Sequence, residues 1–499
     1  MQDQEQSQGQ PALAGCYTEA TKHRLADVMT PLQIQQLRGS KPASAVKPSW
    51  PVSPEAAPRP AFYLTALFVF VVYARVPEIM DIVTGSAFRS VRVIMVLALL
   101  AVPFGADIRA AFSKVGICLM AFTLWMCVCI PFSVWRGGSA RMLRDSWVIS
   151  LFSFVIIASA VRGLEQCRRI MYALAAATVF IETFTLVTGR VQGGRVALLK
   201  GTLGNANYLA LILLMGVPFC LFVMRTKRGL SPLKFACLLM VLCIPVTVVS
   251  TGSRGGLVTL AVMFVIYFWP LPASQKVVVS IVALILLVVA IAWSTRSALD
   301  RFRTIFSNST PVHLSESEQS AIESADLRKE LLLSSLQLTL RHPLLGVGPG
   351  MFSLANANYA VADTGRANAN LWHETHNTFT QLSCEDGLPG LFLYCLALLF
   401  CFKIVNAAGK LARQYPALDS LQHMAFALRL ALVAFVGTAL FASNAYMYYF
   451  PMLAGLCVAV GRATGEFSSQ MPAGSEQPDI SPQAAKTWRS YRPGTPGGR

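Results

Sequence analysis

From about residue 61 onward, long apolar runs alternate with short polar stretches. Several runs reach or approach the roughly 18–20 residues that an α-helix needs to cross a bilayer. Backbone groups inside a bilayer must be satisfied within the segment, and for an open chain only a helix achieves this. We therefore predict an all-α polytopic membrane protein with about twelve transmembrane helices. The expected helices cover residues 61–79, 88–105, 113–134, 146–161, 168–188, 204–224, 234–251, 255–270, 276–294, 374–402, 424–444 and 446–461.

Polar segments frame and interrupt this pattern. Both ends of the chain are rich in Pro, Ser and other polar residues, which predicts disordered tails. A third polar segment separates the ninth and tenth expected helices and forms one large outer loop. The predicted order is a tail (1–60), helices one to nine (61–293), the loop (294–373), helices ten to twelve (374–461) and a second tail (462–499).

The second half of the outer loop predicts an amphipathic helix. Leucines there fall on two stripes at helical spacing, nearly opposite each other. One stripe holds Leu332, Leu333, Leu336 and Leu340, and the other holds Leu327, Leu331 and Leu338. A helix of this kind either lies on the membrane, covers a cavity, or packs between the bundle and the rest of the loop.

Composition and charge support the membrane class and suggest an orientation. Only 13% of the 499 residues are charged, the mean hydropathy is +0.53 and the net charge is +17. Lys and Arg concentrate in loops 161–169, 225–234 and 403–413, which lie on the same side if the predicted helices cross in turn. Because positive loops stay in the cytoplasm, both termini are expected there, in a bacterial cytoplasmic (inner) membrane protein. This use of the positive charge is favoured over binding to nucleic acid.

Basic residues on the other side do not follow this rule. Arg195 and Lys200 precede Asn205 and Asn207, which open the sixth expected helix. These cations and amides suit an anionic, sugar-bearing ligand, although Asn205 is equally a good helix N-cap. Arg254 stands between two apolar runs in "TGSRGG". A guanidinium there either binds phosphate through its planar fork or lies at the lipid headgroups.

The stretch "HETHNTFTQLSCEDGLPG" (373–390) places titratable groups at the start of an apolar run. A helix over this stretch would put His376, Thr380, Ser383, Gly387 and Gly390 on one face. At the water–membrane boundary an imidazole titrates near neutral pH and can act as a base. The alternative is an interfacial histidine that only binds a neighbouring loop.

Taken together, four motifs resemble the bacterial O-antigen ligase family, which includes O-antigen polymerases and O-linked oligosaccharyltransferases. The segments are "GTLGNAN" (201–207), "TGSRG" (251–255), "PLLGVGPGMF" (343–352), and His376–Asn377 followed by Gly387 and Gly390. In the family the first motif commonly reads N-P-N, and here Ala206 replaces the proline.

The resemblance implies a membrane-embedded glycosyltransferase of the GT-C-like class. It would move a glycan from undecaprenyl pyrophosphate to an acceptor hydroxyl, such as lipid A-core or another glycan or protein, with inversion and without metal or cofactor. His376 is the expected base and Arg254 the expected stabiliser of the pyrophosphate. The expected substrate-binding residues are Arg195, Lys200, Asn205, Asn207, His373, Glu374 and Asn377. A polymerase of the same superfamily is the alternative, and a transporter is a more distant one.

Overall fold

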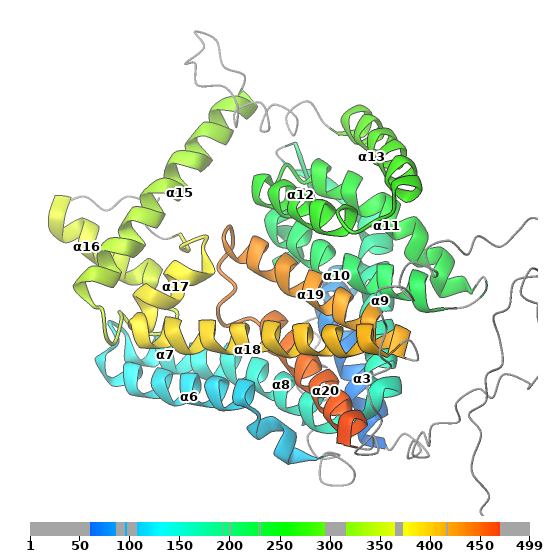
Figure 1. The fold of residues 1–499 in the computed structure, drawn as a ribbon. Helices are drawn as coiled ribbons and strands as arrows, with labels where there is room; N and C mark the ends of the chain where they lie inside the picture. Colours follow the sequence, from blue (N-terminus) through cyan, green and yellow to red (C-terminus); the bar gives the residue numbers. More distant parts are fainter. Residues whose placement is uncertain are drawn as a thin grey trace, which may run out of the picture. The chain divides into compact units, whose positions relative to one another are not determined.

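A computed structural model describes residues 60–85, 95–96, 107–192, 194–198, 201–227, 229, 231–294, 316–364, 373–415 and 418–469. Side chains of residues 192, 316–325, 360–364 and 466–469 lie outside this description. All the described residues belong to one compact unit, Ala57–Arg499. Its ribbon is almost entirely helical (Figure 1).

Eight helical segments in the described part of the chain are long and apolar enough to cross a membrane. They are Lys114–Phe132 (α6 with a short 3₁₀ turn), Arg136–Ala160 (α7 to α8), Gly163–Thr188 (α9), Ala206–Thr226 (α10), Pro232–Ser250 (α11), Ala273–Trp293 (α13), Gly387–Gln414 (α18) and Asp419–Ala439 (α19). Shorter apolar helices are α3 (Pro60–Tyr73) and α12 (Arg254–Phe268). The prediction of an all-α polytopic membrane protein is therefore supported, whereas the count of twelve is not confirmed.

Several predicted helices have different limits in the structure. The first ends at Tyr73, and α4 (Val76–Thr84) follows after a break at Ala74 and Arg75. The predicted segment 88–105 lies outside the described residues except for 95–96. The last helix, α20 (Tyr449–Ser469), extends into the region expected to be a disordered tail.

The largest correction concerns the predicted helix 374–402. It is two helices, α17 (Thr378–Glu385) and α18 (Gly387–Gln414), separated at Asp386. Gly387 has φ +72°, a left-handed conformation that glycine adopts without steric cost. Because His376 precedes α17, it does not share one helical face with Ser383 and Gly390 as predicted.

Helix α10 lies at the centre of the bundle. In the most apolar 18-residue stretch of α10, 78% of the stretch is buried. The corresponding figure for α13, on the periphery, is 6%. It contacts α9, α11, α12 and α19, while α18 packs on α6 and α20 packs on α8 (Figure 1). The buried residues of α10 run from Ala206 to Val223 and are almost all apolar, so the helix is enclosed along most of its length.

The described part of the predicted outer loop holds the helices α15 (Glu316–Arg341) and α16 (Phe352–Thr364). Helix α15 runs beside α17, and Thr339 Oγ1 lies 2.8 Å from Ser383 Oγ. Leu331 and Leu338 are buried against Phe352 and Cys384. One of the two predicted leucine stripes is therefore a packing face.

Candidate functional site

A cluster of hydrogen bonds joins the segment that carries His376 to the loop between α19 and α20 (440–448). The backbone N–H of His376 donates to Ser443 Oγ at 2.9 Å, and Thr375 Oγ1 lies 3.0 Å from the same oxygen. Thr378 Oγ1 donates to the carbonyl oxygen of Ala442 at 2.7 Å and accepts from the N–H of Asn444 at 3.0 Å. The histidine is thus held in place through its backbone N–H.

His376 has an unusual backbone conformation. Its φ is +53°, and only Arg75 shares a positive φ among the described non-glycine residues. A side chain in this region costs of order 1–3 kcal/mol, and such residues persist where the surroundings enforce them, often at active sites. The sequence pattern predicts a helix over His376 and gives no sign of this conformation.

The electrostatic surroundings keep the His376 imidazole neutral. Burial, with added repulsion from Arg328 and His373, lowers the pKa of His376 to about 4. At neutral pH the ring therefore has a lone pair on one nitrogen, which is what a proton acceptor requires. The pKa of His376 thus lies below the near-neutral value expected for an imidazole at the water–membrane boundary.

Asn377 has a structural role in this arrangement. Its Oδ1 accepts from the N–H groups of Phe379 at 2.9 Å and Thr380 at 3.1 Å, which caps α17. Its Nδ2 donates to the carbonyl oxygen of Leu440 at 3.2 Å. The expected substrate-binding amide is thus occupied in fixing the start of α17 to the 440–448 loop.

The turn that carries Arg254 approaches the same loop. Arg254 is the first residue of α12, whose N-cap is Ser253, and its side chain is half-buried. A Cβ on the neighbouring Gly255 would come within 2.4 Å of the Phe441 ring. The structure therefore brings both the Arg254 turn and the His376 segment against residues 440–445, at one end of the bundle.

Arg195 connects the Arg254 turn to the N-terminal end of α10. It lies on β2 (Arg195–Ala197), which pairs antiparallel with β1 (Arg190–Gln192). Its Nε donates to the carbonyl oxygen of Thr251 at 2.8 Å, and its Nη2 donates to Asn207 Oδ1 at 2.9 Å. Asn205 is the N-cap of α10, which was the predicted alternative to ligand binding. Its Oδ1 accepts from the N–H of Asn207 at 3.0 Å. Lys200 lies outside the described residues.

His373 and Glu374, two further residues expected to bind substrate, lie just before His376 in the chain. Glu374 is exposed, and its Oε2 accepts from the hydroxyl of Tyr208 at 3.0 Å. The same hydroxyl lies 3.2 Å from the carbonyl oxygen of Ser443. His373 is exposed, and its carbonyl oxygen accepts from Ser353 Oγ at 3.0 Å. Of these residues only Glu374 is linked through its side chain to the N-terminal end of α10.

Sequence reasoning missed two basic residues near this site. Arg328 on α15 is half-buried, and its charge acts on the His376 imidazole. Arg75 donates from Nη2 to the Tyr449 hydroxyl at 2.8 Å and forms an ion pair with Glu78. Glu78 Oε2 in turn accepts from the N–H of Thr202 at 3.1 Å. The sequence did offer a signal for Arg75, because Arg75 and Glu78 are charged residues inside an apolar run, where charges are rare.

The glycine-rich segment 343–352 binds a side chain of this chain. Glu385 accepts through Oε2 from the N–H of Gly350 at 3.1 Å and through Oε1 from the N–H of Phe352 at 3.0 Å. Because a carboxyl group of the chain itself occupies the N–H groups of Gly350 and Phe352, these two groups are not free to bind a phosphate.

A second buried carboxyl group adjoins Glu385. The Tyr446 hydroxyl lies 2.7 Å from both Glu385 Oε2 and Asp386 Oδ2. A phenol has a single proton, so the second contact requires a protonated carboxyl group. Burial raises the pKa of Glu385 to about 7 and the pKa of Asp386 well above its usual range. Asp386 is thus the neutral acid, and neither group is placed to bind sugar in the open.

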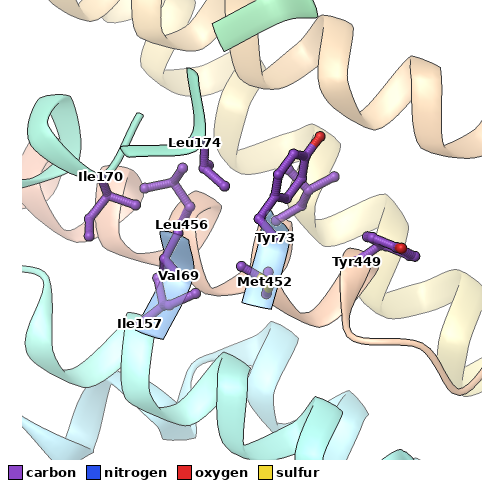
Figure 2. A pocket seen from close by; sticks show the side chains of 9 residues that line it. Val69, Tyr73, Ile157, Ile170, Leu174, Tyr449, Met452 and Leu456 are labelled. Carbon is purple, nitrogen blue, oxygen red and sulfur yellow. The ribbon is translucent and has the colours of Figure 1, made fainter. Parts of the chain in front are cut away.

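A small cavity lies beside the N-terminal half of α20. Val69, Tyr73, Ile157 and Met452 are among its lining residues (Figure 2). The walls are almost entirely apolar, and Tyr449 marks the side nearest Arg75. It offers no set of polar groups for a glycan, so the convergence at 440–448 remains the candidate site.

The fold and this cluster define a class: a multi-pass α-helical membrane protein with a histidine and several arginines gathered at one end of the bundle. The model of the O-Antigen ligase family matches residues 235–395. No curated protein matches the chain. The chain therefore carries the domain of the O-antigen ligase family, and the resemblance drawn from the motifs is confirmed. The match includes Arg254 and His376, whereas Arg195 and the 440–448 loop lie outside it.

Proposed function

We propose that this protein transfers a glycan from undecaprenyl pyrophosphate to an acceptor hydroxyl on the outer face of the bacterial cytoplasmic membrane. The observation that carries the proposal is the convergence of the Arg254 turn and the His376 segment on the 440–448 loop. The O-antigen ligase family match supports the reaction class. Lipid A-core or a comparable glycan or protein is the acceptor under this proposal.

The His376 imidazole acts as the general base. It takes the proton of the acceptor hydroxyl as the acceptor oxygen forms a bond to the anomeric carbon. The bond between that carbon and the phosphate oxygen breaks, and its electron pair leaves with the pyrophosphate. A single displacement of this kind inverts the anomeric carbon. A positioned base contributes roughly 10²–10⁴-fold to the rate, and the neutral state of His376 at pH 7 supports this role.

Cationic side chains stabilise the leaving pyrophosphate. The family resemblance implies a reaction without metal, which assigns the developing negative charge to guanidinium groups. Arg254 is the first candidate, and the action of Arg328 on His376 supports adding it. Arg195 orients the Arg254 turn through Thr251. Lys200, His373 and Glu374 remain proposed substrate-binding residues, and Asn205, Asn207 and Asn377 contribute through the contacts that hold these segments.

The distribution of basic residues supports an outer-face site. Asn205 caps the N-terminal end of α10, while Arg225 lies at its C-terminal end and stacks on Tyr267 and Phe426. A helix of 21 residues spans about 30 Å. The candidate site and the basic 225–234 loop thus lie at opposite ends of a membrane-length helix, as the proposal of cytoplasmic termini requires.

The test is a gene deletion complemented with wild type, His376→Ala or Arg254→Ala, followed by gel display of surface glycans and lipid-linked intermediates. A ligase predicts free lipid-linked polymer and bare acceptor in the deletion strain and in both variants. Decoration with a single repeat unit would instead identify the alternative, a polymerase. Near wild-type transfer by His376→Ala would remove the base assignment.

An assay with purified protein distinguishes an enzyme from a transporter. With lipid-linked donor and acceptor supplied in detergent, where no compartments exist, an enzyme forms the transferred product. A transporter would form none.

A further inference from the structure

The leucine stripe of α15 that does not pack remains exposed. Leu331 and Leu338 are 2% and 3% exposed on the packed face. The other stripe has exposed fractions of 37% for Leu332, 51% for Leu333, 44% for Leu336 and 81% for Leu340. Four leucines on one face of one helix form a continuous apolar surface, which a protein in water rarely leaves uncovered.

This leucine stripe is distinct from the polar face of the same helix. Asp326, Glu330, Gln337 and Arg341 are also exposed and follow one another around the next sector of the helix. From Leu332 to Arg341, helix α15 thus has a packed face, a leucine face and a polar face, and the exposed Lys329 lies at the N-terminal end of the leucine face. A helix at a membrane surface has this division, because one exposed face meets lipid and the other meets water.

The leucine stripe continues onto a membrane-spanning helix. The N–H of Leu388 in α18 donates to the carbonyl oxygen of Pro343 at 2.8 Å, just after α15 ends. Leu344 and Leu388 are 66% and 50% exposed, and Phe392 one turn further along α18 is 63% exposed. In Figure 1, α15 slants away from the N-terminal end of α18 instead of continuing its axis. The exposed leucines therefore adjoin the apolar surface that α18 presents to lipid.

We propose that the leucine stripe of α15 (Leu332, Leu333, Leu336 and Leu340) inserts among the acyl chains of the bilayer, next to the site. The occupant of this face is lipid, because the stripe continues onto a membrane-spanning helix and is bordered on its other side by polar residues. Docking α15 in this way also fixes Arg328, one turn before Leu332, relative to the His376 segment. The proposal does not depend on the transfer reaction.

The test places an environment-sensitive fluorescent amino acid at position 336 or 340 of the full chain, reconstituted in liposomes. Position 337, on the polar face, is the matched control. We expect emission at shorter wavelength at 336 and 340 than at 337, with quenching by lipids brominated on their acyl chains and protection from aqueous iodide. Position 337 should be quenched by iodide instead. An unchanged gel-filtration profile in detergent checks that each variant is folded.

Two outcomes would overturn the proposal. Equal iodide quenching at 336 and 337 would mean that the leucine stripe faces water. Protection of 336 from both quenchers would mean that protein, such as a second copy of the chain, covers the stripe instead of lipid.

Discussion

Arg195 donates a hydrogen bond from Nη2 to Oδ1 of Asn207 across 2.9 Å. The same guanidinium donates from Nε to the carbonyl oxygen of Thr251. A cation and an amide that the sequence suggested as ligand-binding groups are thus bonded to each other. Their contact holds the "GTLGNAN" segment beside the "TGSRG" turn.

Arg195→Lys should weaken this junction. A lysine ammonium is a compact point donor and cannot reproduce the planar fork that reaches two acceptors. Loss of a hydrogen bond from a charged group costs about 1.5–3 kcal/mol, so the melting temperature and the transfer rate should both fall. Thermal unfolding in detergent measures the first effect, with Arg190→Lys on the exposed β1 as the matched control. Equal melting temperatures for the two variants would contradict the junction.

Replacement of His376 should separate stability from activity. His376→Gly relieves a positive φ of +53°, and glycine adopts this conformation without steric cost. We expect unchanged or higher thermal stability together with a loss of transfer of roughly 10²-fold or more. His376→Asn, which tolerates the same conformation, is the control for side-chain volume. A glycine variant that unfolds at lower temperature would indicate a structural role for the imidazole.

The pH dependence of transfer should lack an acidic limb near pH 6.5. The pKa of His376 is lowered to about 4, so the imidazole stays neutral and able to accept a proton down to roughly pH 5. Because the unfolded chain takes up this proton near pH 6.5 and the folded chain only near pH 4, stability should fall as pH falls through that window. His376→Gln should lose this part of the pH dependence. Measured kcat/KM and melting temperatures from pH 8 to 4.5 test both statements, and a midpoint near 6.5 would refute them.

The Asn377 side chain makes two kinds of contact, and substitutions can test each one separately. Asn377→Asp keeps an oxygen acceptor for the N–H groups of Phe379 and Thr380 but loses the donor to Leu440. Asn377→Ala loses both, and loss of an N-cap costs about 0.5–2 kcal/mol. We expect the alanine variant to be less stable than the aspartate variant, and both to transfer more slowly than wild type. Equal stabilities would mean that the cap does not contribute.

A double-substitution cycle tests the contact between the Arg254 turn and the 440–448 loop. In Gly255→Ala the new Cβ would lie 2.4 Å from the Phe441 ring, which forces the two segments apart. We expect reduced transfer and stability, with partial recovery when Phe441→Ala is added. Gly465→Ala, where no atom lies within 4 Å of the added Cβ, is the matched control. Additive losses in the double variant would argue against the contact.

The sequence predicted the bundle better than the site. Apolar runs located α9, α10, α11 and α13 to within a few residues, because length and hydrophobicity are local properties of the chain. The interpretation of Asn205 as an N-cap was equally local and is confirmed. Breaks were harder to predict, because the helices on either side of Asp386 together form a continuous pattern. Asn377 was available as a start signal and Gly387 as a stop signal.

Contacts across the chain lay beyond sequence reasoning. Nothing in the sequence pairs Ser443 with His376, or Arg195 with Thr251, because each contact depends on how distant segments fold together. The sequence named the chemistry-bearing residues by type and by family motif. Only the hydrogen-bond partners show which of these residues hold distant segments of the chain together.

The position of Ser443 has a consequence for protein engineering. The backbone partner of His376 lies beyond the end of the family-matched segment 235–395. A chimaera that exchanges only this segment between relatives would join a histidine from one parent to a supporting loop from another. Swaps that carry residues 440–448 along with the matched segment should therefore retain function more often than swaps that stop at 395.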